Sequence, residues 1–172
     1  MAYSSAYKRF LASVPTAQRE YRTIEIFHPQ FSGMLRFVQD KELVEFKLEA
    51  TAPRGSRTIA SFFPLSMEIK EPGETDQLDS ALLVRLGAVG GEVFSELNRI
   101  NGSGFFTPIE VIYRKYYSGS LDNPMIVMYL SAKNIVFEGY STIMFNAEDL
   151  DLSNTQAGEF YLLSRFPQLA NV

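Results

Sequence analysis

The sequence of 172 residues contains no cysteine, no tryptophan and a single histidine, His28. Without cysteine there are no disulfides, no thiolate metal sites and no cysteine nucleophiles. A Ser-His-Asp triad would have to use His28, and the sequence has no Gly-x-Ser-x-Gly motif. Hydrophobic runs are short, and none approaches the ~20 residues of a membrane-spanning helix. Lys8 and Arg9 interrupt the apolar N-terminal residues, so we expect no signal peptide.

Aromatic and acidic residues are abundant by comparison. The chain has 14 Phe and 9 Tyr, which suit half-buried strands and protein interfaces. Its formal net charge of −4 opposes contacts with a phosphate backbone, which need clustered Lys and Arg. No linker, repeat or low-complexity tract divides the chain, which is long enough to bury a sizeable core. We therefore expect one soluble domain over residues 1–172, without sequence-specific binding of nucleic acid.

Period-two alternation of apolar and polar residues predicts several strands. The clearest case is 43–50, where Val44, Phe46 and Leu48 alternate with charged residues. Pro64 should divide another strand pattern, because proline cannot donate a hydrogen bond to a neighbouring strand. The remaining patterns of this kind cover residues 21–28, 34–38, 59–70 and 81–86.

We expect the sheet to be organised around residues 107–145, read as three successive strands. The first, 108–117, alternates and should have one wetter face. The second, 125–131, is apolar at nearly every position, which predicts a central strand covered on both faces. The third, 135–145, should pair back through a turn at 132–134, where Asn134 tolerates a positive φ.

Two helices are predicted from apolar residues at helical spacing. The first covers residues 4–14 and ends at Pro15; it either packs on its own sheet or docks on a neighbouring subunit. The second covers residues 92–100, with Asn101 and Gly102 as its stop. The buried stripe of this second helix should be Val93, Phe94, Leu97 and Ile100. Together the patterns predict a mainly β fold with a minor α+β character: an antiparallel β-sandwich or split barrel with one or two flanking helices.

Two loops have a superficial likeness to ligand-binding motifs. Residues 87–91 are rich in glycine but fit neither G-x-G-x-x-G nor the P-loop, so we interpret them as a tight turn. Residues 149–153 begin like a calcium loop, but Asn154 and Phe160 stand where an EF-hand needs Gly and Glu. We expect a solvated loop there and leave open whether an ion binds near Asp149 and Asp151. The sequence predicts no metal site, no cofactor and no catalytic residue.

Two side-chain groupings were weighed as functional sites. Glu25 and His28 lie in one predicted strand with opposite facing, so they should not converge as a catalytic pair. The second grouping joins aromatic and basic residues, as in single-strand nucleic-acid binders: Tyr113, Tyr116 and Tyr117 beside Arg114 and Lys115. The acidity of the chain opposes that function, and such residues suit a core or an interface equally well.

Several segments, in this order, resemble a family of small tail proteins of tailed bacteriophages and prophages that is labelled as a domain of unknown function. Gln168 stands where that family usually has glycine, and the loop at 51–58 looks longer than typical. The segments that carry the resemblance are Phe10-Leu11-Ala12-Ser13-Val14-Pro15, His28-Pro29, Leu35-Arg36-Phe37-Val38, Phe63-Pro64-Leu65, the 109–117 strand and Arg165-Phe166-Pro167-Gln168-Leu169.

The resemblance implies a structural virion protein, without enzymatic activity, at the tip of the phage tail. Such minor or distal tail proteins form rings that join the tail tube to the hub or baseplate, with a β-sandwich or split-barrel fold. A hexameric homo-oligomer, with tail-tube and hub proteins as neighbours, is therefore the expected assembly. It would be put together in the bacterial cytoplasm and would have only passive contact with translocating DNA.

A ring would need subunit interfaces, and the ends of the chain carry aromatic residues suited to them. The residues expected at these interfaces lie in the N-terminal helix and in a C-terminal arm, 159–172: Tyr7, Phe10, Phe160, Tyr161, Phe166, Pro167 and Leu169. Alternatives left open are a β-sandwich module that binds host-surface carbohydrate, a tail-assembly factor, and a glycosidase with a carboxylate pair.

Overall fold

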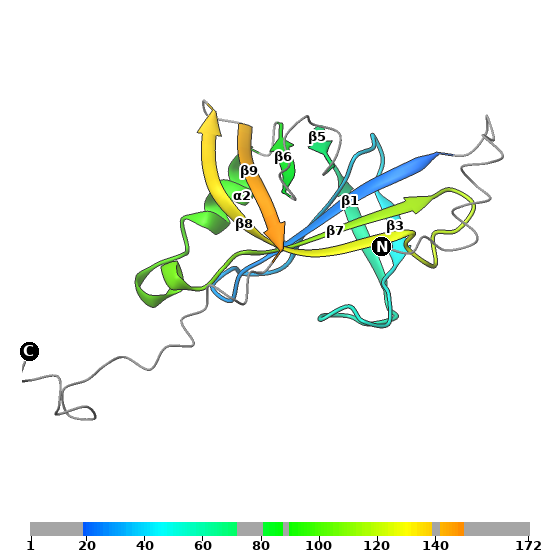
Figure 1. Ribbon diagram of the computed structural model, residues 1–172, viewed down its shortest axis with the longest axis horizontal. Helices are drawn as coiled ribbons and strands as arrows, with labels where there is room; N and C mark the ends of the chain where they lie inside the picture. Colours follow the sequence, from blue (N-terminus) through cyan, green and yellow to red (C-terminus); the bar gives the residue numbers. More distant parts are fainter. Residues whose placement is uncertain (1–18, 72–80, 88–89, 139–141, 150–172) are drawn as a thin grey trace, which may run out of the picture.

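The computed structural model describes residues 19–71, 81–87, 90–138 and 142–149 (Figure 1). The predicted N-terminal helix 4–14 and C-terminal arm 159–172 lie outside these residues. The elements are β1 (Glu20–Phe27), β2 (Leu35–Val38), β3 (Val44–Lys47), β4 (Ile59–Pro64), β5 (Met67–Lys70), β6 (Leu82–Leu86), α2 (Gly90–Leu97), the 3-10 helix η1 (Gly102–Phe106), β7 (Glu110–Tyr117), β8 (Ile126–Glu138) and β9 (Thr142–Asp149).

The described strands form one sheet of nine strands in the order β3-β4-β2-β1-β7-β8-β9-β6-β5. The expected mainly β class is confirmed. The sheet is not closed into a barrel, since β3 and β5 are its two edges. It is mixed rather than purely antiparallel, because β2 and β4 run parallel.

The sheet bends at β8, where the predicted turn at 132–134 is wrong. Residues on both sides of this point belong to one strand of 13 residues, and the return to β9 follows Glu138. The pairing with β9 shifts register between Lys133 and Val136, and Asn134 has φ +53°. The positive φ therefore produces a bulge inside a strand, which bends it, instead of a hairpin turn.

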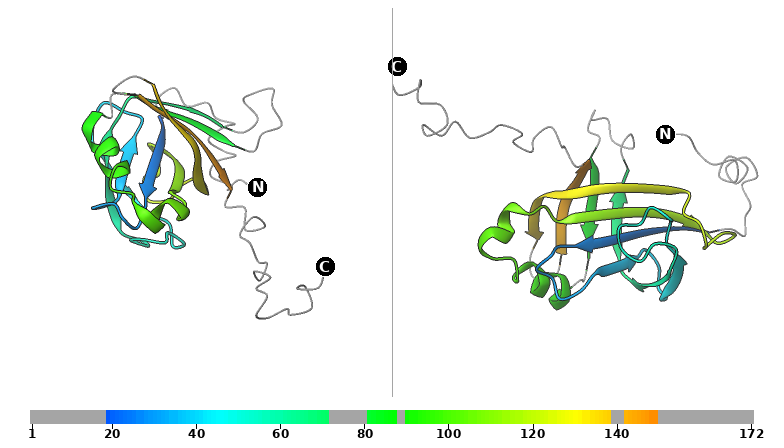
Figure 2. Two further views of the ribbon diagram at one scale, coloured as in Figure 1. Left: turned by 90° about the vertical axis from the view of Figure 1, so that its left-hand side faces the viewer. Right: turned by 90° about the horizontal axis from the view of Figure 1, so that it is seen from below.

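Because β8 bends, the two parts of the sheet face each other. β8 pairs with β7 through its first residues and with β9 through its later ones. In Figure 2, β5, β6 and β9 run across the direction of β1 and β7. The larger core lies between these parts and includes Ile24, Val84, Val111 and Phe145. One folded sheet thus encloses the core that a sandwich would place between two sheets.

A second core lies on the other face of β1, β2 and β7. It is covered by β3, β4 and the segment that joins them. The ring of Phe46 stacks on the ring of Tyr116, with their centroids 4.4 Å apart. The same ring meets Phe62 edge to face, with a centroid distance of 5.4 Å. Ala52, in the loop at 51–58, is buried here. The loop at 51–58 therefore forms part of the cover of the sheet.

The fully covered strand is β7, and this reverses two expectations. All six residues Val111–Tyr116 are buried, so β7 has no wetter face. The apolar strand β8 is central in the sheet, but Tyr129 is 37% exposed, so β8 is not covered on both faces. We expected a wetter face on this strand because charged side chains are rarely buried without a partner.

Candidate functional site

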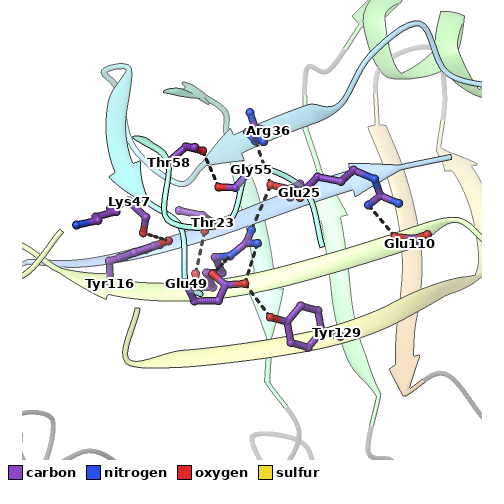
Figure 3. Close-up of polar contacts among 12 residues, drawn as sticks. Thr23, Glu25, Arg36, Lys47, Glu49, Gly55, Thr58, Glu110, Tyr116 and Tyr129 are labelled. Atoms are coloured by element: carbon purple, nitrogen blue, oxygen red, sulfur yellow. Dashed lines mark hydrogen bonds and ion pairs between the residues drawn. The ribbon is translucent and has the colours of Figure 1, made fainter. Parts of the chain in front are cut away.

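One of the two buried faces of β7 carries an ionic network centred on Arg114, whose partners are drawn in Figure 3. The Arg114 guanidinium donates to both carboxylate oxygens of Glu49, at 2.7 and 3.0 Å. It also contacts Glu25 Oε2 at 3.3 Å, which accepts a second bond from Arg36 Nε at 3.0 Å. Tyr129 donates its hydroxyl to Glu49 at 2.8 Å. The network thereby joins β1, β2, β7 and β8 to the segment after β3.

A second ionic cluster lies on the opposite face of the same strand. Lys115 Nζ is 2.5 Å from Glu71 Oε1 and 3.5 Å from Glu20 Oε1. Tyr113 donates its hydroxyl to Glu71 at 2.7 Å, and Arg22 contacts Glu20 at 3.1 Å. This cluster ties β1 and β7 to the end of β5.

The partners of these carboxyl groups determine their pKa values. Burial alone raises the pKa of Glu49, but hydrogen bonds from Arg114, its own backbone and Tyr129 outweigh it and leave the pKa below its usual range. In the same way, burial is outweighed at Glu71 by hydrogen bonds from Lys115 and Tyr113, and the pKa is lowered. Burial lowers the pKa of Arg114, yet its bond to Glu49 and the charges of Glu25 and Glu49 raise it overall.

Among the described residues, each cluster brings together two cations and two carboxylates. Buried pairs of this kind hold a structure together, because losing one partner leaves an uncompensated charge. Tyr113, Tyr116 and Arg114, considered above as residues of a nucleic-acid surface, are fully buried and cannot stack on bases. Within the described ranges, no group of three or more His, Asp or Glu side chains is arranged to hold a metal ion.

In the helix α2, the burial of two side chains differs from the prediction. Phe94, predicted to be buried, is 49% exposed, whereas Glu96 is buried. Glu96 accepts hydrogen bonds from the Ser32 amide at 2.6 Å and the Ser32 hydroxyl at 2.5 Å. These two bonds hold the pKa of Glu96 below its usual range. They fasten α2 to the turn after β1 in an orientation that leaves Phe94 facing solvent.

The short helix η1 is fastened to the same turn by His28 and Gln30. His28 Nδ1 accepts from the Gln30 amide at 3.2 Å, and His28 Nε2 lies 3.1 Å from the Gly104 carbonyl. These partners fit a neutral ring that carries its proton on Nε2, because a carbonyl only accepts and an amide only donates. The Gln30 side chain bonds the backbone of Asn101 in both directions, at 2.8 and 3.2 Å. His28 is therefore a structural residue, and it does not meet Glu25.

These attachments leave a set of large apolar side chains exposed, which we call the aromatic end. Phe106 is 91% exposed and Phe105 is 72% exposed, both on η1. Phe94 on α2 meets Phe137 on β8 edge to face, with ring centroids 5.5 Å apart. The aromatic end consists of Phe94, Phe105, Phe106 and Phe137.

A groove of about 420 Å³ runs between α2, η1 and the later part of β8. Its floor is continuous with the larger core, since Ile109 belongs to that core and Ala132 packs against it. Apolar side chains with a few polar neighbours make a surface suited to apolar groups of a partner. The lining residues are Leu97, Asn98, Ile100, Gly104, Phe105, Phe106, Thr107, Pro108, Ile109, Ala132, Ile135 and Phe137.

A second apolar surface lies on β4 and beside the start of the edge strand β3, which Figure 1 shows on the far side of the sheet from α2. Ile59 and Phe63, four residues apart on β4, are 67% and 58% exposed, and Leu43 is 49% exposed. We call these three residues the strand surface.

The seven interface residues predicted from the sequence, in the N-terminal helix and the C-terminal arm, lie outside the described residues. The sequence does contain a signal for the aromatic end, because Phe105 and Phe106 are adjacent and follow Gly104 in a stretch without strand alternation. That pattern points to exposed aromatic side chains on a short turn.

Fold and surfaces define a mainly β protein with exposed apolar surfaces and a buried ionic network. The chain belongs to the family described as a domain of unknown function, DUF1833, which matches residues 6–157. A search of curated proteins finds no match to the sequence. None of the helices in the described part of the chain has the length and hydropathy to cross a bilayer.

Proposed function

We propose that this protein is a structural component of the tail tip of a tailed bacteriophage. Copies form a ring that joins the tail tube to the hub or baseplate, after assembly in the bacterial cytoplasm. The resemblance in the sequence suggests this role, and the observation that carries it is the aromatic end. Contiguous apolar surface facing solvent is a mark of interaction sites, because isolated monomers rarely expose it.

A ring needs a heterologous interface, in which two different surfaces of identical subunits meet. The described residues offer two such surfaces, the aromatic end and the strand surface, on different elements. Each contributes apolar side chains of the kind enriched at the centre of interfaces. We therefore assign the ring contact to the aromatic end of one subunit and the strand surface of the next. A stable contact should bury ~1,600 Å² in total.

Sedimentation of the purified protein over a range of micromolar concentrations tests this assignment, with negative-stain images of the largest species. We expect closed rings of uniform size. A monomer at every concentration would contradict the proposal, and binding of that monomer to a glycan array would favour a carbohydrate-binding module instead.

Two surface variants sharpen the test. One carries Phe105→Ser with Phe106→Ser, and the other carries Ile59→Ser with Phe63→Ser. Each variant alone should remain monomeric, because one side of every contact is damaged. An equal mixture should give dimers, since each variant supplies the surface that the other lacks. Rings formed by either variant alone would rule out this pair of surfaces.

A further inference from the structure

The groove at the aromatic end lies close to the point where the chain leaves the sheet. Ser131 on β8 pairs with Glu110 on one side and with Glu148 on the other. The end of β9 is therefore two strand spacings, roughly 10 Å, from the start of β7. Ile109 and Ala132, which line the groove, stand beside these positions.

The residues that follow β9 contain an apolar segment long enough and near enough to reach the groove. Apolar residues return at 160–169, with Phe160, Tyr161 and Phe166 among them. The residues 150–159 that precede this segment span up to about 33 Å when extended. That length exceeds the separation between the end of β9 and the groove, so the connection imposes no strain.

We infer that residues 160–169 bind in the groove of their own chain while the protein is unassembled. A tether of this length keeps the segment at a millimolar effective concentration, above that of other copies in dilute solution. Binding covers Phe105 and Phe106, the most exposed aromatic residues of the described chain. Removing their apolar area from water drives the association.

The volume of the groove fits this occupant. About 420 Å³ is within the range of pockets that hold a few apolar groups, and it is too small for a whole segment of this length. A small number of aromatic side chains therefore enter the groove, while the rest of the segment crosses its rim. The predicted interface residues of the C-terminal arm thereby gain a partner within their own subunit. On ring formation, the strand surface of a neighbour would displace them.

Cysteine cross-linking tests the inference directly, because the natural chain has no cysteine. Thr107→Cys places a thiol in the groove lining, and Ser164→Cys places one in the segment, with every aromatic residue kept. In dilute solution, where rings do not form, this pair should oxidise at least about tenfold faster than a matched pair with Ser61→Cys in place of Thr107→Cys. Peptide mass spectrometry should find the disulfide within one chain.

Two results would overturn the inference. One is equal oxidation rates for the two pairs. The other is a disulfide that forms only between chains, both in the double variant and when the single variants Thr107→Cys and Ser164→Cys are mixed under the same conditions. Because these measurements use unassembled protein, they can fail while the ring proposal stands, and the reverse also holds.

Amide hydrogen exchange supplies a readout without cysteine. Ending the chain at Gly158 should increase exchange in residues 102–108 several-fold and leave exchange in β7 unchanged. Unchanged exchange in residues 102–108 would also contradict binding of the segment in the groove.

Discussion

Two regions of this protein reverse the usual distribution of side chains. On β7, charged residues lie inside, and Arg114 has no exposed surface. At the aromatic end, phenylalanine lies outside, and Phe106 is almost fully exposed. The charged region has a partner for each charge, whereas the apolar side chains face solvent.

The difference separates stability from function. A buried charge is tolerated only when partners and hydrogen bonds compensate its desolvation, so the network around Arg114 is committed to the fold. An exposed aromatic side chain contributes little to the folded state of its own chain and is available to another surface. Variants in the first region should therefore change unfolding, and variants in the second should change association.

The largest effect on stability is expected for Arg114→Met. The variant leaves Glu49 without its bidentate partner and leaves Glu25 with Arg36 as its remaining cation. Such a loss in a buried network costs about 3–5 kcal/mol of unfolding free energy. Urea unfolding measures it. The matched variant Arg85→Met removes an exposed pair with Glu138 and should cost at most about 1 kcal/mol. Equal losses would show that the buried network has no special role.

An intermediate effect is expected for Gly104→Ala, which links the two regions. A Cβ at this position would lie 2.1 Å from Gln30 Oε1, so the amide that holds Asn101 must move. Losing two or three hydrogen bonds costs about 1–3 kcal/mol, measured by thermal unfolding. Gly33→Ala is the control, because a Cβ there meets nothing within 4 Å. If Gly104→Ala unfolds like the wild type, η1 is not fastened in this way.

Acid should destabilise the protein through the carboxyl groups with lowered pKa values. Glu49, Glu71 and Glu96 have folded-state pKa values below their ordinary 4.5, so the unfolded chain takes up protons first. Their stabilisation is present above that value and is lost as the pH falls through the folded-state values. Unfolding free energies measured from neutral pH to pH ~4 and below should decline accordingly. Glu49→Gln should flatten the decline, and Glu68→Gln at the exposed edge should not.

The smallest effect on stability is expected for Phe106→Ser. In the chain that ends at Gly158, which lacks the segment 160–169, this exposed side chain has little to lose, so its replacement should change the unfolding free energy by less than about 0.5 kcal/mol. Phe46→Ser, in the second core, provides the contrast and should cost more than about 3 kcal/mol. A large loss for Phe106→Ser would place that side chain in a folded contact instead of on a docking surface.

Much of the sheet could be predicted from alternation. Ile24, Ile26, Phe46 and Met67 are buried as expected, and Pro64 divides β4 from β5. These cases succeed because one face of each strand meets a core, so the side-chain period is visible in the sequence.

The remaining features depend on distant partners. A positive φ at Asn134 fits a turn as well as a bulge, and the pairing of β8 with two neighbours decides between them. Burial of Arg114 depends on Glu49, and the exposure of Phe94 follows from the bond between Glu96 and Ser32. Local pattern contains neither partner, so the sequence could not place the ionic network or the exposed side chain of Phe94.

The most direct test of the account is sedimentation of the Phe105→Ser, Phe106→Ser double variant beside the wild type and Arg85→Met. We expect the double variant to remain monomeric at concentrations where the other two form rings. In chains that end at Gly158, the same double substitution should change the unfolding free energy by less than about 0.5 kcal/mol, which shows that the fold is intact. Ring formation by the double variant at wild-type concentrations would contradict the claim that the aromatic end is the site of assembly.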